Sequence, residues 1–201
     1  MKQIILFYLL CISTNIAFGG VDTVQVYSEA MDQTIPNLVI TPKDYTEQND
    51  ELPVIYLLHG AGGYFSNWFF RVPEIEQYAT DYNMIIVCPD GDKTSWYIDS
   101  PIDSTSQYES YITRELVPAI DQKYRTIKQK NGRAITGLSM GGHGAFYLAF
   151  RHQDIWGAAG SMSGGVNIIP FAEEWNMDEI LGPYHQFKKN WEDHTVINLI
   201  H

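Results

Sequence analysis

The chain has 201 residues, 45% of them apolar, and its 13 lysine and arginine residues against 24 aspartate and glutamate residues give a formal net charge of −11. This length and apolar content suffice for one well-buried domain and are too small for two of ordinary size. The acidic balance argues against nucleic acid or an anionic membrane as partner, because both carry the same sign of charge.

Residues 1–19 predict a cleaved signal peptide. An apolar run over residues 4–12 follows a lysine, and Ala17-Phe18-Gly19 has small residues at the spacing that a signal peptidase needs. The run is shorter than the roughly 18 to 20 residues that span a bilayer, and Cys11 follows a leucine rather than the small residue of a lipoprotein site. We therefore expect a secreted or periplasmic protein whose domain occupies residues 20–201, with no membrane attachment after cleavage.

Four strands and a helix are predicted in the first half of this domain. Residues 21–26 and 37–41 read as two half-exposed strands that pair as an antiparallel edge. Residues 53–59 form a continuous apolar run, typical of a strand buried on both faces. A helix over residues 73–82 and a second buried strand over residues 84–88 follow. The cysteine in that second strand, Cys88, is expected to be a buried and inert thiol.

The second half continues the alternation of helices and strands. Ser106-Gln107-Tyr108-Glu109 matches a capping box at the start of a helix that Pro118 should kink or divide. The next elements are a strand over residues 133–137, a helix over residues 141–151 and a strand over residues 156–161. Apolar residues at helical spacing over residues 191–200 predict a final amphipathic helix that is still in progress. This alternation indicates an α/β fold with a mostly parallel sheet covered by helices on both faces.

The motif Gly137-Leu138-Ser139-Met140-Gly141 predicts a nucleophile. It fits the G-x-S-x-G elbow, in which a serine lies on a sharp turn between a strand and a helix. Such a motif would arise by chance in this composition with a probability of roughly 7%, but it stands directly between a predicted strand and a predicted helix. We interpret Ser139 as the nucleophile, with the backbone N–H groups of Met140 and Ala61 as oxyanion donors and Gly62 as the alternative to Ala61.

Five motifs together make the sequence resemble the Putative esterase family, the esterase D-like α/β-hydrolases. They are His59-Gly60-Ala61-Gly62-Gly63, Cys88-Pro89-Asp90-Gly91, Ser95-Trp96-Tyr97, the elbow with its continuation Gly142-His143-Gly144-Ala145, and Gly160-Ser161-Met162-Ser163-Gly164-Gly165. That family includes feruloyl and acetyl-xylan esterases, S-formylglutathione hydrolases and mycolyltransferases. The resemblance runs from about Val21 to the last residue and implies an α/β-hydrolase fold and a Ser139 nucleophile, with Ala61 and Met140 as oxyanion donors. We expect no cofactor.

The acid and histidine of a catalytic triad are not evident in the sequence. In the family that the chain resembles, both would fall beyond His201, so we expect a C-terminally incomplete fragment that lacks its last two strands and has weak or no activity. Asp178 with His185 or His194, and Asp193 with His201, satisfy the required order along the chain. None of these residues follows a recognisable strand, which is where catalytic loops should lie.

The expected substrate is a carboxylic ester, with acyl or feruloyl groups on carbohydrate favoured by export and by the resemblance. Trp96, Ser163 and Gly62 are the candidate substrate-binding residues, because they fall in loops at the presumed carboxyl edge of the sheet. An acyltransferase and a non-catalytic carbohydrate-binding protein are the alternatives. No cluster of His, Cys or Asp has the spacing of a metal site, and the oligomeric state is left open.

Overall fold

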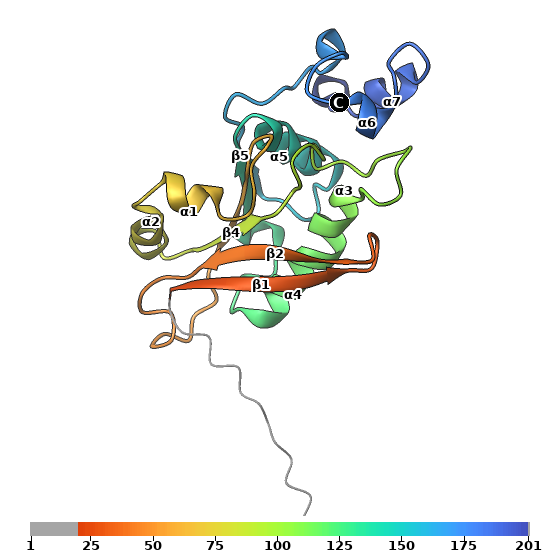
Figure 1. The fold of residues 1–201 in the computed structure, drawn as a ribbon. Helices are drawn as coiled ribbons and strands as arrows, with labels where there is room; N and C mark the ends of the chain where they lie inside the picture. The colour runs from red at the N-terminus through yellow and green to blue at the C-terminus, as the bar shows by residue number, and fades with distance from the viewer. Residues whose placement is uncertain (1–19, 201) are drawn as a thin grey trace, which may run out of the picture.

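The protein is described by a computed structural model that covers residues 20–200, so the expected signal peptide lies outside the described residues. Six strands form one sheet in the order β1-β2-β4-β3-β5-β6 (Figure 1). The pairs β1–β2 and β2–β4 are antiparallel, whereas β4–β3, β3–β5 and β5–β6 are parallel. The strands are β1 (Val21–Ser28), β2 (Gln33–Ile40), β3 (Val54–Leu58), β4 (Ile85–Pro89), β5 (Arg133–Gly137) and β6 (Ala158–Ala159). The predicted antiparallel edge and the predicted parallel centre are both confirmed.

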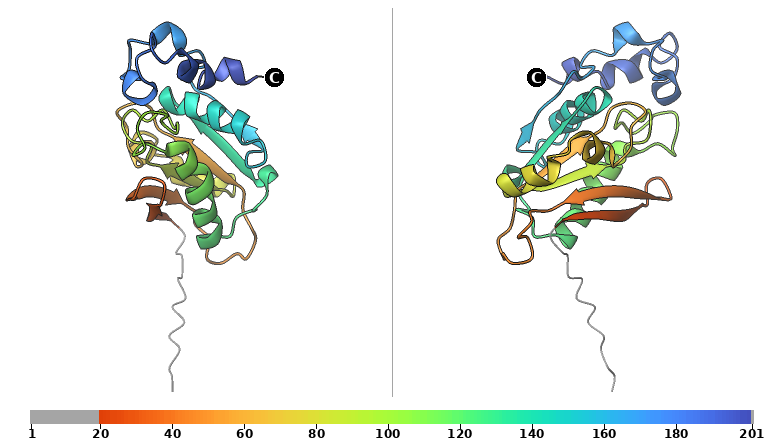
Figure 2. Two further views of the ribbon diagram at one scale, coloured as in Figure 1. Left: turned by 90° about the vertical axis from the view of Figure 1, so that its right-hand side faces the viewer. Right: turned by 60° about the vertical axis from the view of Figure 1, so that its left-hand side comes forward.

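Helices cover both faces of this sheet (Figure 2). The α-helices are α1 (Asn67–Arg71), α2 (Ile75–Asp81), α3 (Tyr108–Ser110), α4 (Val117–Lys123), α5 (Met140–Arg151), α6 (Asp178–Leu181) and α7 (Lys188–Asp193). A π-helix spans Tyr111–Leu116, and short 3₁₀ helices span Lys130–Gly132, Ile169–Phe171 and Val196–Leu199. The segment that follows β6, with α6 and α7, lies beyond the end of the sheet near α5 (Figure 1).

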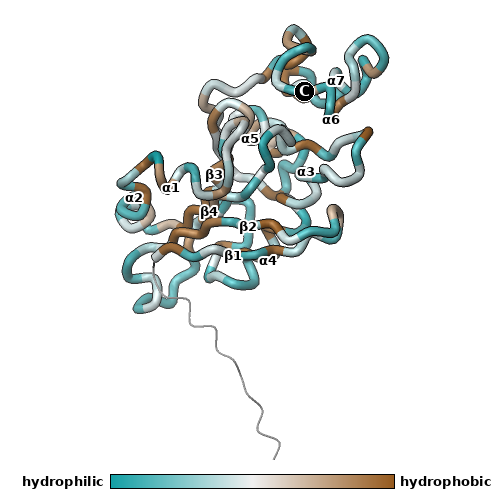
Figure 3. The backbone as a smooth tube through the Cα atoms, in the orientation of Figure 1, coloured by the Kyte–Doolittle hydropathy of each residue, from teal (hydrophilic) through white to brown (hydrophobic). Residues whose placement is uncertain are grey.

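Two hydrophobic clusters hold the layers together, and alternate residues of β4 point into each. Ile85 and Val87 belong to the larger cluster, which contains the buried faces of α4 and α5. Ile86 and Cys88 belong to the smaller cluster, which contains α2. Figure 3 shows the matching concentration of hydrophobic residues along the inner strands. Because β4 is buried on both faces, its sequence is a continuous apolar run without the alternation of an edge strand, and Cys88 is a buried free thiol as expected.

The predicted capping box at Ser106 is wrong. Gln107 is the N-cap of α3, and no side chain caps that helix. Glu109 is drawn away from the helix end because Tyr147, Arg151 and His152 all donate hydrogen bonds to its carboxylate. The Glu109 carboxylate thus takes hydrogen-bond donors from a distant part of the chain instead of capping its own helix.

The division expected at Pro118 is not found, because Leu116 and Val117 keep right-handed helical dihedrals and the chain stays helical from Tyr108 to Lys123. The π-helix Tyr111–Leu116 ends directly before α4, and Pro118 occupies the first turn of α4. The N–H of Val117 donates to Ile112 O in the π-helix, so the proline, which has no N–H, lies where a π-helix passes into an α-helix.

Two predictions about the last quarter of the chain need correction. The strand expected over residues 156–161 is reduced to β6, because only Ala158 and Ala159 pair continuously with β5, followed by an isolated bridge to Met162. The prediction of an amphipathic helix over residues 191–200 is also wrong. α7 ends at Asp193, and Thr195 adopts an extended conformation with its hydroxyl donating to Trp191 O before the chain enters a 3₁₀ helix.

Candidate active site

Ser139 occupies a sharp turn between β5 and α5 at the carboxyl edge of the sheet. Its φ of 56° and ψ of −115° lie in a region that L residues rarely adopt, and its side chain is exposed. Its N–H donates to Met162 O at 2.8 Å. A Cβ on Gly141 would lie 2.5 Å from Leu58 O, so a glycine is needed where α5 passes β3. This is the strand, strained turn and helix that the elbow motif requires.

The glycine-rich loop after β3 approaches this turn directly. A Cβ on Gly60 would lie 3.2 Å from Leu138 O and 3.6 Å from the Cβ of Ser139. We call residues 59–63 the oxyanion loop. Among residues 20–200, neither the N–H of Ala61 nor that of Met140, the first residue of α5, donates a hydrogen bond. The N–H of Gly62 donates to Lys93 O at 2.8 Å, so of the two residues considered for this loop, Ala61 has the free donor.

The imidazole of His59 fixes the start of the oxyanion loop. Its Nε2 accepts the N–H of Gly91 at 2.9 Å, so the ring proton is on Nδ1, which donates to Gly60 O at 2.9 Å. Burial lowers the pKa of His59 and keeps this neutral tautomer. Tyr97 donates its hydroxyl to His59 O at 3.2 Å, and burial raises the pKa of Tyr97 well above its ordinary value, so the donor stays protonated.

The candidate substrate-binding residues fall in different environments. Ser163 is exposed and follows Met162, the residue whose carbonyl binds the N–H of Ser139. Trp96 is only 3% exposed, and its ring packs on His143 at 5.2 Å and on Trp175 at 5.6 Å between centroids. A ligand can therefore reach little of the Trp96 ring while Trp175 stays in place.

No triad partner meets Ser139 within the described residues. Among residues 20–200, the Ser139 hydroxyl forms no hydrogen bond. Among the described residues, the His185 ring hydrogen-bonds only Gln186, and His194 Nδ1 hydrogen-bonds Asn190 O. Asp178, at the start of α6, forms no hydrogen bond with either histidine. The remaining pair, Asp193 with His201, includes a histidine that lies outside the described residues.

His143, one turn into α5, is buried against two carbonyl groups. Its Nδ1 lies 3.3 Å from Trp96 O and its Nε2 lies 3.1 Å from His194 O. Burial lowers the pKa of His143 to about 4. At neutral pH the ring therefore has a single N–H and donates to one of the two carbonyls. This histidine ties α5 to the Trp96 loop and to the segment after α7.

A buried carboxylate behind α5 was missed by sequence reasoning. Glu109 accepts hydrogen bonds from Tyr147 at 2.7 Å, Arg151 at 2.8 Å and His152 at 2.7 Å. Burial opposes ionisation, but the bonds from His152, Arg151 and Tyr147 outweigh it and lower the pKa of Glu109 to about 2. The only signal in the sequence was the spacing of Tyr147 and Arg151 on one face of a helix, which does not name the partner.

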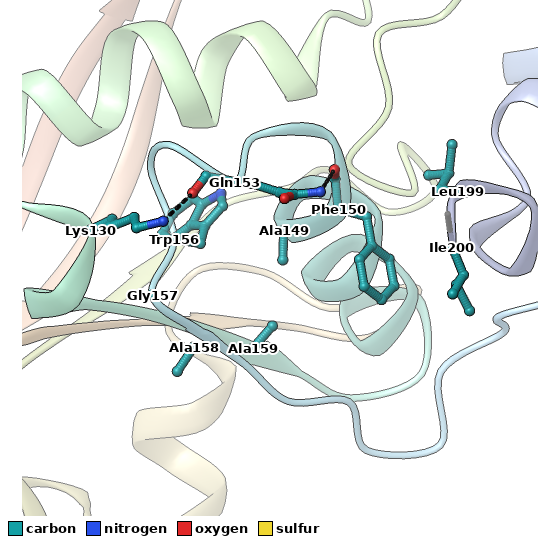
Figure 4. A pocket seen from close by; sticks show the side chains of 10 residues that line it. All are labelled: Lys130, Ala149, Phe150, Gln153, Trp156, Gly157, Ala158, Ala159, Leu199 and Ile200. Carbon is teal, nitrogen blue, oxygen red and sulfur yellow. Dashed lines mark hydrogen bonds between the residues drawn. The ribbon is translucent and has the colours of Figure 1, made fainter.

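Three cavities of the structure lie away from Ser139. One of about 370 Å³ opens beside β6 and is bordered by Phe150, Leu199 and Ile200 (Figure 4). A second, of about 440 Å³, lies between Arg151 and the segment after α7. A third, of about 620 Å³, lies between β1 and α4. None of the three is bordered by the oxyanion loop or by the elbow.

Within residues 20–200, no group of three or more His, Cys, Asp and Glu side chains is arranged to hold a metal ion. The helices of this same region are all too short or too polar to cross a membrane.

The fold and the elbow define an α/β-hydrolase, with a serine at the carboxyl edge of the sheet facing a glycine-rich loop. The family model described as "Putative esterase" matches residues 28–201. The chain belongs to this esterase family.

Individual relatives agree with this assignment. The chain is 33% identical over 133 residues to esterase Rv1288 of Mycobacterium tuberculosis, a match that covers 65% of this chain and 29% of that protein. A solved ferulic acid esterase is 28% identical with a TM-score of 0.73, covering 91% of this chain and 71% of the other. The S-formylglutathione hydrolase of Agrobacterium tumefaciens, 24% identical, has the same fold with a TM-score of 0.75, covering 94% and 73%. The chain thus spans under a third of the curated relative that it matches.

Proposed function

We propose that this protein hydrolyses carboxylic esters through an acyl-enzyme on Ser139. The Ser139 hydroxyl attacks the ester carbonyl carbon and loses its proton, the alcohol leaves with a proton, and water then releases the acyl group as an acid. The observation that carries the proposal is the exposed Ser139 in a strained turn, beside the backbone N–H groups of Ala61 and Met140, which have no other partner among residues 20–200. These groups would stabilise the negative oxygen of the tetrahedral intermediate.

The described residues also indicate how fast ester hydrolysis should be. Because no described histidine hydrogen-bonds Ser139 Oγ, the described residues supply the nucleophile and the oxyanion donors but no general base in place. Enzymes that have lost a triad member still accelerate their reaction by roughly 10³ to 10⁴-fold over water. We expect residues 20–200 by themselves to work at that level.

The substrates that we propose are acyl or feruloyl esters of carbohydrates outside the cytoplasm. The 28% identity to a ferulic acid esterase over 91% of the chain supports the substrate class, and the signal-like residues 1–19 support export. Beyond the elbow, the exposed aromatic rings of Phe171 and Trp175 pack with centroids 5.0 Å apart and planes tilted by 32°, and they offer a face for a sugar or a phenolic ring. Terminal sequencing of the exported protein would test cleavage after residue 19.

Labelling with a fluorophosphonate tests the nucleophile. We expect one adduct on Ser139, detected by intact mass and peptide mapping, and hydrolysis of a soluble aryl ester by the unlabelled protein. Ser139→Ala should lose the adduct, whereas Ser163→Ala, an exposed serine of the neighbouring loop, should keep the adduct. An unlabelled Ser139 in the full chain would contradict the proposal and favour a non-catalytic carbohydrate-binding protein. Transfer product in excess of free acid would favour an acyltransferase.

A further inference from the structure

The oxyanion loop is anchored by one neighbouring loop, residues 90–97. The N–H of Gly91 donates to the His59 ring at 2.9 Å, and Lys93 O accepts the N–H of Gly62 at 2.8 Å. The hydroxyl of Tyr97 donates to His59 O at 3.2 Å. Ala61 lies between these anchored residues and is exposed. The direction of its N–H is therefore set by the bonds on either side.

Tyr97 also contacts the second element of the site, the elbow helix α5. The residue is fully buried, and a Cβ on Gly144 would lie 2.5 Å from its ring. Gly144 is one helical turn beyond Met140. The Tyr97 ring thus packs against the element that carries one oxyanion donor, while its hydroxyl holds the loop that carries the other.

The backbone of Tyr97 is held in an unfavourable conformation. Trp96 and Tyr97 are consecutive residues with φ of 54° and 59°, which bulky side chains rarely adopt. Such conformations persist only where the surrounding structure dictates them, and they are concentrated at functional sites. Here Ser95 supports the turn, because its hydroxyl accepts the N–H of Tyr97 at 3.1 Å.

We propose that Tyr97 is a positioning residue that sets the separation between the N–H groups of Ala61 and Met140. This inference rests on the proposed function, because it takes these two groups as the oxyanion donors. Oxyanion donors act only when they lie 2.7–3.1 Å from the developing charge. The hydroxyl of Tyr97 holds His59 O, two residues before Ala61, at a fixed distance from α5. Without the Tyr97 hydroxyl, the oxyanion loop can move away from the elbow.

The test compares Tyr97→Phe with Tyr111→Phe. Both tyrosines are fully buried, and each loses one hydroxyl with its hydrogen bonds. Among residues 20–200, the Tyr111 hydroxyl bonds only Asn37 of β2, at 2.7 and 2.9 Å, and neither the oxyanion loop nor α5. Each variant keeps its ring, so each should fold. Removing a whole oxyanion donor costs about 10² to 10³ in kcat, and displacing one should cost about tenfold. We expect Tyr97→Phe to lose about tenfold in kcat for ester hydrolysis, with KM changed by less than about twofold. In Tyr111→Phe, both kcat and KM should stay close to their native values.

A second readout does not depend on turnover. The backbone amide signals of Ala61 and Met140 in the ¹⁵N–¹H spectrum of the full chain should shift in Tyr97→Phe and stay in place in Tyr111→Phe. An unshifted Ala61 signal, or equal losses of kcat in the two variants, would overturn the positioning role. If Ser139 takes no fluorophosphonate adduct in the full chain, the proposed function fails, and the amide signals alone then decide whether Tyr97 positions the oxyanion loop.

Discussion

Replacing Ser139 by glycine should stabilise the fold while it removes the nucleophile. Ser139 has a φ of 56° and a ψ of −115°, and a conformation of this kind costs of order 1–3 kcal/mol in a residue with a Cβ. Glycine adopts it without that cost. The Ser139 side chain is exposed and its hydroxyl has no hydrogen-bond partner among residues 20–200, so the substitution sacrifices no described contact.

The size of the effect follows from two opposing terms. Relief of strain contributes about 2 kcal/mol, and the greater freedom of glycine in the unfolded chain subtracts roughly 0.5–1 kcal/mol. The net gain is about 1 kcal/mol, which raises Tm by about 2–4 °C in a chain of this size. The native serine would then be kept for chemistry at the expense of stability.

Thermal and urea unfolding of three proteins would measure this difference. Ser139→Ala is the matched control, because alanine also lacks the hydroxyl but keeps the Cβ and therefore the strain. We expect its stability to lie within about 0.5 kcal/mol of the native protein, and Ser139→Gly to exceed both. A glycine variant no more stable than the alanine variant would show that the turn holds no strain.

Two further predictions concern stability and association. The pKa of Glu109 falls from 4.5 in the unfolded chain to about 2 in the fold, so its stabilising contribution is complete above about pH 4.5 and is lost as the pH falls through about 2. As the pH is lowered between these limits, the free energy of unfolding should therefore fall more steeply in the native protein than in Glu109→Gln. Parallel pH curves for the two proteins would refute this role of Glu109. Ala159→Lys should reduce light scattering on heating, because a charge blunts the exposed edge at β6, whereas the charge-matched Gln186→Lys should have no effect. Equal reduction in both variants would mean that net charge, and not the edge, controls association.

Much of the fold could be predicted because the sequence patterns that indicate it lie within short segments. A strand buried on both faces, such as β4, must be apolar at every position, and the turn at Ser139 needs small residues on either side. Both constraints are visible within a few residues of sequence. The C-terminal segment was less predictable, because the hydroxyl of Thr195 ends a pattern that otherwise reads as a helix.

The sequence by itself therefore determined the sheet, the elbow and the loop that faces it, since each follows from periodicity or from residue sizes near one turn. Only the tertiary structure decided which groups hold that site together. It assigned Glu109 to Tyr147, Arg151 and His152 rather than to a helix cap, and it joined Tyr97 to His59 across 38 residues of chain. The physical reason is that a buried polar group takes its partner from whatever packing brings near it, and sequence spacing does not encode that distance.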